Sequence, residues 1–106
     1  MHAATDKRKV LRSEIIMVLQ SLGNSIYKTI MWHMNTRGVF SNPEVIDIDV
    51  FYNNLQILLG PLTDEILEMT FKHLKQKYGI REYDDLSPTT TAYDKIRIWL
   101  NEMERE

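Results

Sequence analysis

The sequence predicts a single all-α domain, a compact bundle of about five helices arranged as stacked helical hairpins. Its 106 residues fit one domain, with residues 1–6 as a flexible start. Glycine and proline divide the chain into five segments, and apolar residues recur within each at helical spacing. A composition of 43% hydrophobic and 26% charged residues is typical of globular domains rather than disordered chains.

The first two helical segments meet at Gly23, which favours a left-handed helix stop. The apolar stripe of the first comprises Leu11, Ile15, Val18 and Leu22, with Leu19 at its edge. Asn24 or Ser25 is expected to cap the second helix, which ends at Gly38. Its stripe comprises Ile26, Tyr27, Ile30, Met31 and Met34.

Residues 39–48 read as a loop, because the residue before Pro43 disfavours helix. Asp49 is a suitable cap for a third helix, which Gly60 ends. The stripe of this helix comprises Phe51, Tyr52, Leu55, Leu58 and Leu59.

A fourth helix is expected to begin near Pro61 or Thr63 and to end before Gly79. Its stripe comprises Leu67, Thr70, Phe71, Leu74 and Tyr78. Ser87 or a following threonine opens a fifth helix. This last stripe comprises Ala92, Ile96, Trp99, Leu100 and Met103. The order of a helix, Leu-Gly, a second helix and Gly occurs twice, which favours two stacked hairpins.

Several classes of protein are excluded or disfavoured by composition. The chain has no cysteine, which rules out disulfide scaffolds, cysteine zinc sites and cysteine nucleophiles. Its longest apolar run, residues 15–19, is too short to span a membrane, and no signal peptide is visible. We therefore expect a cytoplasmic protein that does not enter the membrane.

No motif for catalysis, a metal or a cofactor is found. The glycines are too far apart for a phosphate-binding loop, and the chain has no nucleophile elbow. Neither His33 nor His73 has a carboxylate or second histidine three or four residues away, the spacing that places two ligands on one helical face. We expect no catalytic residues, no metal and no cofactor, and hence no enzyme.

Charge is unevenly distributed along the chain. Residues 1–40 carry six basic and two acidic side chains, whereas residues 41–70 carry six acidic and no basic ones. Either these segments neighbour each other in the fold, or the asymmetry steers the molecule toward a partner or a second copy. The basic run Lys7, Arg8, Lys9 and Arg12 supports an alternative function, a small DNA-binding, transcription-related protein. Its helices show no base-reading face of Arg, Asn and Gln, so nucleic acid is the less favoured partner.

Three large apolar residues lie off the predicted core stripes. Trp32 points nearly opposite the stripe of its helix, and Ile16 and Met17 also fall outside theirs. Two interpretations remain open: these helices are buried on both faces, or these residues contact a protein partner. Trp99, in contrast, lies on a stripe and is expected in the core.

The order of these features resembles an archaeal module, the fifth Nitrosopumilus-type output domain family. The resemblance covers residues 10–80 and rests on the segments 22–27, 32–34, 51–60 and 66–79. It implies a non-catalytic signalling module and brings no catalytic residues. Pro61 and the fifth helix depart from the family pattern.

The leading functional hypothesis is a non-catalytic protein-interaction or signalling module. Its contact residues are Trp32, Ile16 and Met17, and its partner is another protein or a second copy of the chain, as in a homodimer.

Overall fold

The computed structural model describes residues 3–79 and 90–104, and side chains within 7–79 and 90–101. These residues form five α-helices and no strand, which confirms the predicted all-α class. The helices are α1 (Ala3–Ser21), α2 (Asn24–Thr36), α3 (Ile48–Leu59), α4 (Leu62–Tyr78) and α5 (Ala92–Glu104). Of the residues 1–6 that were predicted to form a flexible start, residues 1–2 lie outside the described residues, and α1 begins at Ala3. The radius of gyration of 13.5 Å is that of a compact chain of this length.

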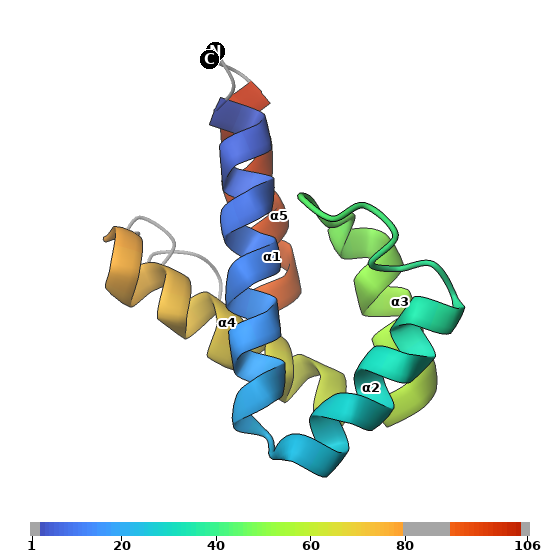
Figure 1. The fold of residues 1–106 in the computed structure, drawn as a ribbon. Helices are drawn as coiled ribbons and strands as arrows, with labels where there is room; N and C mark the ends of the chain where they lie inside the picture. The colour runs from blue at the N-terminus through green and yellow to red at the C-terminus, as the bar shows by residue number, and fades with distance from the viewer. Residues whose placement is uncertain (1–2, 80–89, 105–106) are drawn as a thin grey trace.

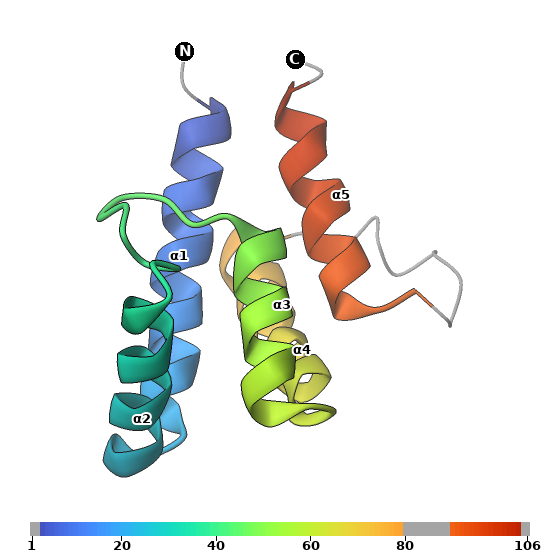
Figure 2. The same cartoon turned by 90° about the vertical axis from the view of Figure 1, so that its right-hand side faces the viewer.

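The centre of the bundle is the contact between α1 and α4. The helix α5 packs on both of them and runs antiparallel to α1 (Figure 1). The helix α2 packs on α1, α3 packs on α4, and α2 and α3 also touch each other. They lie on the side of the bundle that faces the viewer in Figure 2, and they cross each other steeply in Figure 1. Each of these two helices has an inner side against the central pair and an outer side facing away from it.

Most of the predicted stripe residues form one apolar core. Trp99 is buried, with 6% of its surface exposed, as expected. Residues with no more than 1% exposure include Leu11, Ile15, Val18, Leu19, Ile30, Met34, Phe51, Leu55, Leu67, Leu74 and Ile96. Two predictions were wrong: Ile26 and Tyr78 are each 51% exposed. Both lie at helix ends, where the neighbouring helices no longer cover the stripe.

Both hairpin corners depend on glycine. Gly23 (φ 110°) joins α1 to α2, and Gly60 (φ 59°) joins α3 to α4. An added Cβ would meet nothing within 4 Å at either position, so the need for glycine comes from the backbone angle rather than from space. The predicted cap of α2 was wrong, because Gly23 is the N-cap and makes no side-chain bond, and Asn24 is already helical.

The cap of α3 lies two residues earlier than the sequence indicated. The Asp47 carboxylate accepts hydrogen bonds from the backbone N–H groups of Asp49 (3.0 Å) and Val50 (3.2 Å). The loop that precedes it is therefore shorter than predicted, and Asp49 lies in the first helical turn. At α5 the cap is Thr91, whose hydroxyl accepts from the Asp94 N–H, as expected for a threonine. Ser87, the other predicted opening residue, lies outside the described residues.

A buried carboxylate joins α1 to α4, and no sequence pattern indicated it. Glu14 is 2% exposed, and its Oε2 accepts a hydrogen bond from Lys77 Nζ at 2.7 Å. The Nδ1 atom of His73 lies 3.6 Å from the second carboxylate oxygen. The hydrogen bond to Glu14 raises the pKa of Lys77, and the attraction between their charges adds to this effect. Burying Glu14 is tolerated because this cation from α4 offsets part of the desolvation cost.

The cap of α3 can be tested directly. Replacing Asp47→Ala leaves two N–H groups of the first turn without their acceptor and should lower the free energy of unfolding by about 1 kcal/mol. Urea titrations followed by circular dichroism would measure this loss. Asp47→Asn is the matched control, because asparagine caps helices about as well and should retain most of the stability. Equal losses in both variants would contradict the capping role.

Candidate functional site

The outer face of α2 exposes a tryptophan. Trp32 is 69% exposed, so burial between central helices is excluded and the contact interpretation stays open. The hydroxyls of Thr29 and Thr36 donate to backbone carbonyls one turn earlier, the second of them to Trp32 O at 2.7 Å. Lys28 lies one turn before Trp32 on the same side of the helix. The indole is therefore flanked by small threonines, whose hydroxyls have backbone acceptors, and by one cation.

The other two predicted contact residues differ from Trp32. Ile16 is partly buried and packs against the core, so little of its surface is available to a partner. Met17 is 46% exposed on α1. The three residues therefore do not form one uniform patch, and Trp32 has by far the largest exposed apolar surface of the three.

A second apolar ridge, which the sequence reasoning missed, lies on the outer face of α3. Val50 is 42% exposed and Ile57 is 66% exposed. They are seven residues apart and therefore lie on one side of the helix, with Asn53 and Asn54 between them. Their position off the stripe of Phe51 and its neighbours is the signal that could have revealed them, as it did for Trp32.

The four basic residues of the nucleic-acid alternative have partners within the chain. Lys7 donates a hydrogen bond to Trp99 O at 3.3 Å, and Lys9 pairs with Glu44 at 3.5 Å. The guanidinium of Arg12 lies 5.3 Å from the centre of the Phe40 ring. The fourth, Arg8, lines a pocket described below. These four side chains thus approach different segments rather than one common surface.

The basic segment 1–40 and the acidic segment 41–70 meet in an ion pair of the fold. Residues 15–43 contain no acidic residue, and residues 38–71 contain no basic one. If the basic N-terminal segment and the acidic segment neutralised each other, ion pairs between them would be expected. The pair of Lys9 with Glu44 is such a contact. Lys28 and Arg37 of the acid-free segment have no ion-pair partner among the described side chains, and both are exposed.

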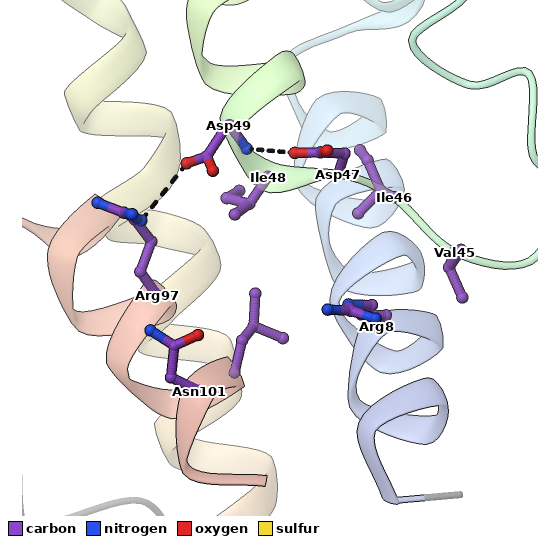
Figure 3. A pocket seen from close by; sticks show the side chains of 9 residues that line it. Arg8, Val45, Ile46, Asp47, Ile48, Asp49, Arg97 and Asn101 are labelled. Carbon is purple, nitrogen blue, oxygen red and sulfur yellow. Dashed lines mark hydrogen bonds and ion pairs between the residues drawn. The ribbon is translucent and has the colours of Figure 1, made fainter. Parts of the chain in front are cut away.

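A pocket lies where α1, α5 and the start of α3 meet. It encloses about 400 Å³, within the usual range for small-ligand sites. Arg8 approaches it from α1, and Arg97 and Asn101 from α5 (Figure 3). Asp49 forms an ion pair with Arg97, with Nε and Oδ1 3.4 Å apart. The buried side chains among its lining residues are Ile46, Ile48 and Leu100.

The charged groups of this pocket already have partners within the protein. The Asp47 carboxylate caps α3, and Asp49 accepts a hydrogen bond from the Tyr93 hydroxyl in addition to its pair with Arg97. Burial raises the pKa of Tyr93 to about 12, and the hydrogen bond to Asp49 adds to this effect. The Tyr93 ring also stacks on Tyr52 of α3 at 4.0 Å between ring centres. These contacts join α5 to α3 and provide no unpaired carboxylate pair for acid–base chemistry.

Within residues 3–79 and 90–104, no group of three or more His, Asp or Glu side chains is arranged to hold a metal ion. None of the helices there is long and apolar enough to cross a membrane.

The Tyr93 phenol predicts a stability change at alkaline pH. Its folded pKa of about 12 lies above the unfolded value of about 10, so the stabilisation is complete below pH 10. It should be lost as the pH rises from about 10 to 12, and Tyr93→Phe should remove this part of the pH dependence. Urea unfolding at several pH values measures it. Lys77→Met is the control, because the pKa of Lys77 is also raised but by a contact with Glu14 of α1 rather than with α3.

The two tryptophans should differ sharply in their contribution to stability. Trp32→Ala should change the free energy of unfolding by less than about 0.5 kcal/mol, because the ring is largely in water. Trp99→Ala should cost about 3–5 kcal/mol, because it leaves a cavity in the core. Urea titration of both variants gives the comparison, and a large loss for Trp32→Ala would show that its ring is packed against the protein.

Comparison of the chain with protein-family models, with curated proteins and with solved structures finds no match. The resemblance of residues 10–80 to the Nitrosopumilus-type output domains therefore stays a prediction, and the function is argued from the surfaces described above.

Proposed function

We propose that this chain is a non-catalytic, cytoplasmic protein-interaction module that binds another protein chain through the outer face of α2. The observation that carries the proposal is the exposure of Trp32. Tryptophan is enriched at the energetic centres of protein interfaces, because it buries a large area while few rotamers are frozen. A role as a signalling output module, which the resemblance implies, is consistent with a contact surface of this kind.

The energy available at this position is substantial. A buried tryptophan removes about 150–250 Å² from water, at about 25 cal/mol per Å². Because 69% of the Trp32 surface is exposed, covering this exposed part would contribute roughly 3–4 kcal/mol to association. Few surface side chains offer as much, and the small threonines on the same helix leave room for a partner to approach the ring.

The nucleic-acid alternative is less well supported. A DNA-binding surface needs several cations on one face, because affinity depends on simultaneous phosphate contacts. Lys7, Lys9 and Arg12 instead contact Trp99, Glu44 and Phe40, which lie on different segments of the chain. The protein surface around Trp32 is therefore the better candidate.

Photocrosslinking tests the proposal. A photoreactive phenylalanine analogue placed at position 32 should form adducts with a second polypeptide in the cells that produce the protein, because this side chain lies at the contact. The same group at Gln20, an exposed polar position on α1, is the control. Adducts are measured by mass spectrometry. No adduct above the Gln20 background would overturn the proposed function, whatever the identity of the partner.

A further inference from the structure

We propose that the pocket between α1, α5 and the start of α3 binds a small zwitterion, an α-amino acid with an apolar side chain. Trp32 is not among the residues that line this pocket, so the inference goes beyond the proposed protein contact and does not depend on it. Three properties of the pocket support it: an adjacent cation and anion with unused hydrogen-bonding atoms, a balance of charge among the lining side chains, and an apolar lining.

The ion pair of Arg97 and Asp49 has hydrogen-bonding atoms to spare. The contact with Arg97 Nε and the hydrogen bond from the Tyr93 hydroxyl both use the Oδ1 atom of Asp49. Among the described residues, neither Oδ2 of Asp49 nor the two terminal nitrogens of Arg97 have a hydrogen-bond partner. A carboxylate has about four acceptor sites and a guanidinium about five N–H donors, so both groups can bind a ligand while keeping their mutual contact. The two side chains are 48% and 52% exposed, so a ligand can reach them.

Asp47 and Asn101 add further unused atoms beside this pair. Oδ1 of Asp47 accepts both of its hydrogen bonds from the first turn of α3, which leaves Oδ2 without a partner among the described residues. Asn101 follows Arg97 by one turn of α5, so the two side chains lie on one face of the helix and on the same side of the pocket (Figure 3). The pocket thus offers acceptors at the start of α3 and donors along α5.

This placement fits an α-amino acid. The ammonium and carboxylate groups of such a ligand are attached to the same carbon atom, so a site that binds both needs an anion and a cation side by side. Arg97 Nε and Asp49 Oδ1 are 3.4 Å apart and meet this condition. The ligand's ammonium would donate to the Oδ2 atoms of Asp49 and Asp47. Its carboxylate would accept two parallel hydrogen bonds from Arg97, with the Asn101 amide as a third donor.

The balance of charge disfavours a ligand with charge of one sign only. The lining side chains include two cations, Arg8 and Arg97, and two anions, Asp47 and Asp49. A phosphate would approach two carboxylates and a metal ion two guanidinium groups, whereas a zwitterion meets the opposite charge at each of its ends. Arg8 lies across the pocket from Arg97 (Figure 3) and adds to the attraction for the ligand's carboxylate.

The apolar lining specifies the ligand's side chain. Ile46, Ile48 and Leu100 are each at most 8% exposed and contribute apolar surface to the pocket. An apolar side chain that covers them leaves water on the side that faces them, which favours binding. A volume of about 400 Å³ is near the lower end for small-ligand sites and therefore favours a single amino acid over a longer peptide.

Calorimetric titration with free amino acids tests the ligand class. The probes are L-leucine, L-methionine and L-phenylalanine, and at least one should bind with a dissociation constant of about 1 mM or tighter. The tightest of them is then compared with the two analogues that lack its amino group or its carboxyl group, which for leucine are isocaproate and isoamylamine. Each analogue should bind at least about tenfold more weakly, because one member of the Arg97–Asp49 pair then has no charged partner on the ligand.

Two variants test the position of the site. Arg97→Gln removes the cation beside Asp49, and Asn101→Asp places a carboxylate next to that of the ligand, so each should weaken binding at least about tenfold. Both side chains are exposed, and circular dichroism should show that both variants keep their helices. Lys95→Gln is the matched control and should bind like wild type, because it removes a cation of the same helix that lies over the Phe71 ring and does not line this pocket.

Each contrary outcome has its own meaning. Absence of binding for all three amino acids at about 10 mM, well above the expected dissociation constant, would overturn the inference. An analogue that binds as tightly as its parent amino acid would overturn the recognition of a zwitterion. Binding that is unchanged in both Arg97→Gln and Asn101→Asp would overturn the assignment to this pocket. None of these results affects photocrosslinking at position 32, so failure of this inference is distinguishable from failure of the proposed function.

Discussion

The contact between α1 and α4 is the constraint on which the remaining structure depends. Each of the other three helices packs on one or both members of this pair, and the core residues with least exposure include several from both helices. At the edge of the pair, Glu14 is buried and Lys77 reaches it from the last turn of α4. A buried carboxylate that depends on one cation is costly to separate from it, so this contact favours one alignment of the two helices.

The two exposed apolar surfaces follow from how this central pair is covered. The helix α5 packs on both central helices, whereas α2 packs mainly on α1 and α3 mainly on α4. A helix that packs on the bundle with one side buries only that side, and the apolar groups on its other side remain in water. Trp32, Val50 and Ile57 are therefore exposed because the chain has no further helix, among the described residues, to place over them.

Helix positions could be predicted well because they depend on local signals. The stripes around Leu11, Phe51 and Leu74 have the helical period, and these three residues are fully buried, as expected. Helix capping was predicted less well. Asp47 and Asp49 are equally good N-cap candidates by residue type and lie only two positions apart, so residue type alone does not decide which carboxylate accepts the first-turn N–H groups. Glu14 could not be predicted, because its partner Lys77 is 63 residues away in the chain. For Trp32 the sequence left both burial and contact with a partner open.

The sequence by itself determined the helical class, the corners at Gly23 and Gly60 and the position of Trp99 in the core, because these depend on backbone preference and on periodicity within one helix. Tertiary structure decided which off-stripe residues remain in water. Helical periodicity indicates that Ile16 and Trp32 lie off the apolar stripes of their helices, but only the packing of neighbouring helices determines whether that side of each helix is covered. The neighbouring helices cover much of Ile16 and leave Trp32 exposed, because none of the described helices packs on the outer side of α2.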